Sequence, residues 1–175
     1  MADLETREET FSIVELPLGV RLSLRLAPAL AAKLGRVAGF PLDLPVNRSG
    51  GADGRLAARV SPDEWLLFAQ TRRPADLADE VAAALDGVFH SLVDVSHRDR
   101  AIAVAGRGAR EVLNGGCPLD LDDRAFPAGA VTRTIFGKVA ILLWRPDAAP
   151  DFRVECRRSQ TPYVLDFLRE VGREF

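Results

Sequence analysis

Two cysteines and two histidines are the side chains in this sequence best suited to nucleophilic or metal chemistry, namely Cys117, Cys156, His90 and His97. Zinc sites use Cys and His at close spacings such as C-x2-C, and these four residues offer no such pair. A reactive thiol needs a pKa lowered by a neighbouring cation, and His97 is the only such partner that the sequence suggests for Cys117. Because free cysteine is usually buried, we expect Cys117 to be a small residue in a packed loop, with a Cys117–His97 thiol enzyme as the competing hypothesis.

The carboxylates form two groups that could do acid–base or cation chemistry. Asp63 and Glu64 are adjacent, so in an extended chain they point to opposite faces and make a poor general acid–base pair. We interpret them as part of a turn. Asp120, Asp122 and Asp123 could offer oxygen ligands, but the run lacks the glycine and the terminal glutamate of an EF-hand loop. A solvated loop is the favoured interpretation.

Two glycine-containing turns could in principle cradle phosphate groups. Gly106 and Gly108 follow an apolar run, but the third glycine of a dinucleotide fingerprint is replaced by Glu111. Gly137 and Lys138 separate two apolar runs and are typical of a hairpin turn rather than a phosphate loop. We therefore expect this chain to have no catalytic residue, no metal ligand and no cofactor-binding residue of its own.

Composition excludes several classes of function. The 175 residues are 47% hydrophobic and 27% charged, which is ordinary for a globular protein. With 23 Lys and Arg against 25 Asp and Glu, the net charge is −2, so we expect no nucleic-acid or anionic-membrane partner. No run approaches the ~20 apolar residues of a membrane span. The charged start is unlike a secretory signal, so the cytoplasm is the expected location and residues 1–10 are expected to be a flexible arm.

Hydrophobic periodicity predicts the elements that must position these side chains. Residues 19–27 alternate strictly between apolar and polar side chains, which indicates a half-buried strand. Helices are expected at 28–37, 74–86 and 109–113 and from Thr161 onward, where Pro162 takes the first helical position. Further strands are expected at 56–60, 65–69, 91–96, 101–105, 131–136, 139–144 and 152–156.

The order of these elements predicts an internal repeat. Residues of about 1–88 and 89–175 each read as strand–helix–strand–strand–helix, and the second half carries an extra strand. We therefore predict one domain over residues 1–175 with an α/β (α+β) fold, mixed sheets and helices packed on one side.

Five segments together resemble one known family. They are SPDEWLL at 61–67, VDVSHR at 93–98, AREVLNGGCPLDL at 109–121, TRTIFGK at 132–138 and FRVECRRS at 152–159. These segments are similar to the gamma subunit of heterotetrameric sarcosine oxidase, and the resemblance runs from about Leu16 to the C-terminus. It implies a fold related to the folate-binding domain of aminomethyltransferase, the T protein of the glycine-cleavage system.

The resemblance implies an accessory, non-catalytic subunit that assembles with alpha, beta and delta subunits. The complex of that family uses water and O2 to demethylate sarcosine oxidatively, giving hydrogen peroxide, glycine and formaldehyde, or methylene-tetrahydrofolate when folate is present. FAD, FMN, NAD and zinc are then expected on the partner subunits. The alternative is a stand-alone folate-binding or folate-dependent one-carbon transfer protein.

Local positive charge indicates where such partners would bind. The preferred subunit-contact residues are His97, Arg98 and Arg100 in one turn and Arg157 and Arg158 after the last strand. A basic patch on a slightly acidic protein favours docking of an acidic partner. Without partners, the same exposed surface can drive the isolated chain to form a homodimer.

Overall fold

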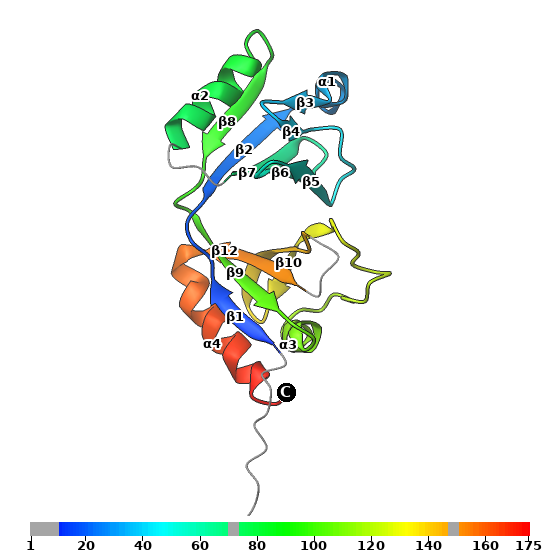
Figure 1. Cartoon of the computed structure of the whole chain (residues 1–175), viewed down its shortest axis with the longest axis vertical. Coiled ribbons are helices and arrows are strands. Elements are labelled where there is room, and N and C mark those ends of the chain that lie inside the picture. The colour runs from blue at the N-terminus through cyan, green and yellow to red at the C-terminus, as the bar shows by residue number, and fades with distance from the viewer. Residues whose placement is uncertain (1–10, 70–73, 147–150) are drawn as a thin grey trace, which may run out of the picture.

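A computed structural model describes residues 11–69, 74–146 and 151–175, and its strands form two five-stranded sheets (Figure 1). The first sheet is built around β2 (Val20–Leu26), whose apolar side chains all enter one core. The strand order is β5 (Arg48–Ala52), β6 (Arg55–Ser61), β7 (Glu64–Ala69), β2 and β8 (His90–Asp94). Two helices, α1 (Pro28–Leu34) and α2 (Pro74–Ala84), cover the face to which these apolar side chains point.

The second sheet repeats this plan with different residues. Its strand order is β1 (Ser12–Glu15), β9 (Asp99–Ala105), β12 (Phe152–Arg157), β11 (Val139–Trp144) and β10 (Val131–Phe136). The helices α3 (Ala109–Asn114) and α4 (Thr161–Gly172) cover one face, and a short 3-10 turn at Arg158–Gln160 leads into α4. Each sheet therefore has a helix-covered face and a face without helices.

The two sheets do not divide the chain at residues 88–89. The strand β8 pairs with β2 in the first sheet, where Leu92 packs against the core. At the other end of the chain, β1 pairs with β9 in the second sheet. The strand β1 thus lies at the edge of the second sheet beside β9, just as β8 lies at the edge of the first sheet beside β2. The two crossovers between the sheets, from β1 to β2 and from β8 to β9, run side by side in Figure 1.

The faces without helices oppose each other and form a third core between the sheets. Along β7, Trp65 and Leu67 enter the first core, whereas Leu66 and Phe68 enter the core between the sheets. The strand β11 supplies Leu142 and Trp144 to the same inter-sheet core. At one side the sheet edges also join by main-chain hydrogen bonds between the residues that flank β5 and β10, such as Val131 N–H to the carbonyl of Asn47 at 3.1 Å.

The α/β (α+β) class and the helices on one face of each sheet are confirmed. The expectation of mixed sheets is wrong, because every pairing between the described strands is antiparallel. The helix expected at 28–37 ends at Leu34, since Gly35 has a φ of 65° that helical residues do not adopt. The chain then makes a small hairpin of β3 (Arg36–Val37) and β4 (Phe40–Pro41). The arm expected at 1–10 lies outside the described residues.

The inter-sheet core predicts a strong dependence of stability on Trp144. Its side chain is 1% exposed, and its ring packs in a tilted arrangement on Phe68 of the opposite sheet, with 5.0 Å between ring centroids. Replacing Trp144 by Ala removes contacts to both sheets, so we expect the free energy of unfolding to fall by about 3–5 kcal/mol. Urea unfolding followed by circular dichroism measures this change. Phe89→Ala is the matched control, because Phe89 is 93% exposed and its loss should matter little; equal effects of the two changes would contradict this packing.

Candidate functional site

A buried ion pair joins the two sheets next to the inter-sheet core. The guanidinium of Arg21 on β2 donates from Nε to Glu155 Oε2 on β12 at 2.7 Å, and both side chains are under 5% exposed. Arg153 Nε donates to the other oxygen of Glu155 at 2.6 Å. The Arg153 guanidinium also lies 5.2 Å from the ring centres of Phe68 and Trp144. Charge pairing and cation–π contact therefore act on the same two sheets at one place.

A second buried carboxylate connects the sheets through other strands. Glu64 on β7 accepts a hydrogen bond from Arg133 on β10 at 2.8 Å and another from Arg25 on β2 at 3.1 Å. Like Glu155, it is shared by two arginines, one from each sheet. Both carboxylates thus take part in holding the two sheets together.

Hydrogen bonds to the main chain of Arg21 hold the crossover from β8 to β9 in place. The N–H of Arg21 donates to Ser96 Oγ at 2.9 Å, and the N–H of Val95 donates to the carbonyl of Arg21 at 2.9 Å. The Ser96 hydroxyl donates to Asp94 at 2.5 Å, and this bond lowers the pKa of the Asp94 carboxyl. The stabilisation that the charged Asp94 carboxylate contributes is fully present above the ordinary carboxyl pKa. It is lost as the pH falls through the lowered pKa of Asp94.

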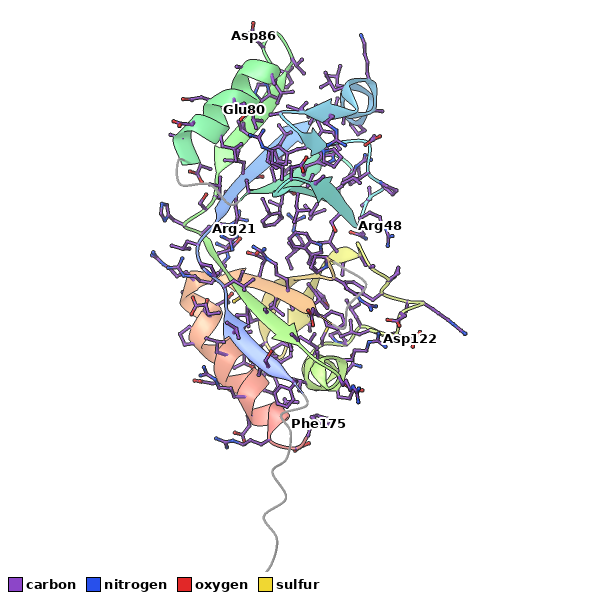
Figure 2. All side chains as sticks on the ribbon, viewed as in Figure 1. Arg21, Arg48, Glu80, Asp86, Asp122 and Phe175 are labelled. Carbon is purple, nitrogen blue, oxygen red and sulfur yellow. The ribbon has the colours of Figure 1, made fainter. Side chains whose placement is uncertain are left out.

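A cleft opens between the sheets beside this crossover. Its volume is about 260 Å³. Apolar side chains of Leu66, Phe68 and Leu142 line its inner wall. The charged residues that line it are Arg21, Arg98, Arg133, Arg157, Asp99 and Glu155. Figure 2 shows Arg21 at the junction of the two sheets.

The five predicted contact residues lie together in the fold. Arg157 is opposite Asp99 in the β12–β9 register, and the N–H of Arg158 donates to the carbonyl of Arg98 at 3.0 Å. His97 is exposed at the crossover. Arg98 and Arg157 line the inter-sheet cleft, whereas Arg100 and Arg158 line a second hollow beside the first turn of α4. The structure therefore divides the predicted patch between two neighbouring depressions.

The residues considered for thiol and metal chemistry are not brought together. Cys117 is 4% exposed within the core behind the second sheet, while His97 is exposed at the crossover, so the paired-thiol hypothesis is not supported. Burial raises the pKa of the Cys156 thiol, which keeps it protonated. Asp122 and Asp123 are exposed in their loop, as predicted. Within the described ranges, no three His, Cys, Asp or Glu residues gather into a group that could hold a metal ion.

Sequence reasoning missed the four residues at the centre of this site, Arg21, Glu64, Arg133 and Glu155. Arg21, Arg133 and Glu155 occupy the polar positions of alternating strands, a pattern that normally marks the solvent face. Glu64 is the first residue of β7, directly after a turn. Of the four, only Glu64 is interpreted from the sequence, as part of a turn. The adjacent pair Asp63 and Glu64 does form the expected turn, but Glu64 is 6% exposed and points between the sheets.

Comparison with known proteins places the chain in a family. The model of the Sarcosine oxidase, gamma subunit family matches residues 25–174. The chain belongs to the sarcosine oxidase gamma subunit family. The resemblance expected from the five sequence segments is confirmed.

Two curated members of this family are similar to the chain over much of its length. The sarcosine oxidase subunit gamma of an Arthrobacter species is 30% identical over 134 residues, which span 75% of this chain and 65% of that subunit. The corresponding subunit of Corynebacterium sp. (strain P-1) is 28% identical over 172 residues, 95% of this chain and 82% of that one.

Two solved structures share the fold. A chain of the heterotetrameric sarcosine oxidase from Corynebacterium sp. U-96, in complex with pyrrole 2-carboxylate, has a TM-score of 0.82 and 27% identity, over 96% of this chain and 87% of that one. Aminomethyltransferase T of the glycine cleavage system from Bartonella henselae has a TM-score of 0.69 and 12% identity, over 91% of this chain and 45% of that one. The second match confirms the aminomethyltransferase-like fold.

Loss of Glu155 should destabilise this gamma-family chain strongly. Glu155→Ala leaves Arg21 buried without its carboxylate, so we expect a decrease of about 3–5 kcal/mol in the free energy of unfolding. Urea denaturation of the purified chain measures it. Glu170→Ala is the control, since Glu170 pairs with Arg173 on the exposed face of α4, where an ion pair contributes about 0–1 kcal/mol. A comparable loss in both variants would show that burial of the Arg21–Glu155 pair has no special role.

Proposed function

We propose that the chain is the accessory, non-catalytic gamma subunit of a heterotetrameric sarcosine oxidase. The complex converts sarcosine, with water and O2, to glycine, hydrogen peroxide and formaldehyde, or methylene-tetrahydrofolate when folate is present. The observation that carries this proposal is the similarity to a chain of a solved heterotetrameric sarcosine oxidase, at a TM-score of 0.82 over 96% of this chain. FAD, FMN, NAD and zinc then lie on the alpha, beta and delta subunits.

The non-catalytic role is supported by what the polar groups of this chain already do. Glu155 and Glu64 are each bound by arginines from both sheets, and the Cys156 thiol is buried with a raised pKa. These groups stabilise the fold, so they are poorly suited to take and return protons or to attack a substrate. Electron and carbon transfer are better assigned to the partner subunits.

The partner surface in this proposal is the patch of His97, Arg98, Arg100, Arg157 and Arg158. The side chains of Arg157 and Arg158 are exposed and have no hydrogen-bond or ion-pair partner among the described residues. His97 is exposed as well. Charged groups left in water at a surface steer association with an oppositely charged partner.

The described residues contain no helix long and apolar enough to cross a bilayer.

Assembly is the direct test of the proposal. When the chain is co-expressed with the alpha, beta and delta subunits of its own source, we expect it to co-elute with a yellow flavoprotein in size-exclusion chromatography. The complex should oxidise sarcosine and produce hydrogen peroxide, which a peroxidase-coupled assay measures. The chain purified alone should be colourless and inactive in the same assay, and should elute as a monomer or homodimer.

Two results would contradict the proposal. One is assembly of the other three subunits into an active oxidase from which this chain is absent in every fraction. The other is turnover of sarcosine by the isolated chain.

The alternative, a stand-alone folate-binding or one-carbon transfer protein, makes a different prediction. The likeness to aminomethyltransferase T concerns the fold alone, and the inter-sheet cleft of about 260 Å³ is smaller than the ~300–1,000 Å³ of pockets that enclose drug-sized ligands. We therefore expect calorimetric titration of the isolated chain with tetrahydrofolate to show no binding tighter than about 1 mM. Micromolar binding would favour the alternative.

A further inference from the structure

The inter-sheet cleft carries more positive charge than its own carboxylates neutralise. Four arginines line it against two carboxylates, and Glu64 outside the lining pairs with Arg133, so one positive charge is left over, although the chain as a whole has a net charge of −2. Glu155, one of the two carboxylates, is shared between Arg21 inside the cleft and Arg153 behind it. The charge imbalance is therefore local to this cleft, and its sign favours an anionic occupant.

Arg157 is the cation of the cleft that is left free. Its guanidinium has no hydrogen-bond or ion-pair partner within residues 11–69, 74–146 and 151–175. Arg98, the other exposed arginine at the crossover, pairs with its own neighbour Asp99 at 3.0 Å, and this pairing stabilises little because the Arg98 side chain is 42% exposed. Both side chains are available to an incoming carboxylate without breaking the ion pairs that hold the sheets.

The cleft is built to accept an apolar group as well as a charge. Leu66, Phe68 and Leu142 form its wall, and each keeps 5–7% of its surface exposed. At about 260 Å³ the cleft lies below the usual range for a drug-sized ligand or cofactor, but it can receive side chains of a protein segment. Size and composition together point to a protein occupant with a carboxylate beside an apolar side chain.

We propose that the cleft receives an acidic segment of a partner subunit, which inserts an Asp or Glu carboxylate between Arg157 and Arg98. An apolar residue next to that carboxylate packs on Phe68 and its neighbours. This proposal rests on the proposed function, because it requires the chain to be part of a complex. It places docking at Arg98 and Arg157, which line the cleft, and not at the hollow lined by Arg100 and Arg158.

Charge reversal at the free arginine tests the proposal. We expect Arg157→Glu to slow association of the separately purified gamma chain with the complex of the other subunits at least tenfold at low salt, as measured by surface plasmon resonance. The difference from the wild type should shrink as salt screens the charges. Arg107→Glu is the matched control, because Arg107 is also exposed but lies on the turn after β9, outside the cleft. Its association rate should stay within twofold of the wild type.

Cross-linking identifies the occupant directly. In the assembled complex, Arg157→Lys places an amine at the cleft, and a carbodiimide should join that amine to an Asp or Glu of a partner subunit, as mass spectrometry of the tryptic digest reads out. The same treatment of an Arg107→Lys complex should give no inter-subunit product at that position.

The possible failures are distinguishable. If the wild-type chain does not assemble, the proposed function fails and this inference fails with it. If the wild type assembles but Arg157→Glu associates at the wild-type rate, or position 157 couples to no partner carboxylate, the cleft proposal alone is overturned. A folded Arg157→Glu variant is verified by its circular dichroism spectrum and Tm, which should match the wild type because the side chain is exposed.

Discussion

Burial of the Arg21–Glu155 pair between two sheets is the constraint on which the structure depends. Removing two charges from water costs several kcal/mol per ion, and only close pairing with further hydrogen bonds offsets that cost. Here Glu155 has hydrogen bonds from both Arg21 and Arg153, and Arg153 lies against two aromatic rings. The pair tolerates burial only while the two sheets stay in one relative position. The pair therefore fixes the relative position of the two sheets more than it adds to the net stability of the fold.

The inter-sheet core explains why the two halves form one body. Helices cover one face of each sheet, so Phe68 on one sheet and Trp144 on the other can be buried only by each other's sheet. The placement of β1 and β8 adds a second reason. Each ends in a crossover that leads directly into the opposite sheet, and β1 completes the sheet formed by residues 99–157. Separating the halves would remove an edge strand and expose an apolar face at once.

The sequence predicted the elements well and their partners poorly, for a physical reason. Alternation in β2, the turn residues between β6 and β7, and Gly137 between β10 and β11 are local signals, and the structure confirms all three. Strand pairing is not local. Nothing in residues 91–96 shows that β8 returns to β2 rather than pairing with the next strand, so the boundary between halves was misplaced.

The candidate site shows even more clearly that local sequence patterns do not reveal long-range pairing. Periodicity separates the two faces of a strand, but it does not say whether the polar face meets water or another sheet. Arg98 and Arg157 could be predicted to be exposed because they belong to basic segments, and the structure shows both at the surface. Arg21 and Glu155 could not be paired, since they lie 134 residues apart and each looks like an ordinary solvated position in its own strand.

The arginines around the cleft differ in what they can do because they differ in pairing and burial. Arg21 is buried and neutralised, so moving or replacing it disturbs the fold before it affects any partner. Arg157 is exposed and unpaired within the described chain, so its charge is solvated and costs the isolated subunit nothing. A partner that covers Arg157 removes the water around its guanidinium, which costs free energy. The partner must therefore supply a carboxylate to offset this desolvation cost. A neutral or basic segment of the same shape would leave a desolvated cation unpaired. In the proposed complex, the cleft therefore selects its partner by charge.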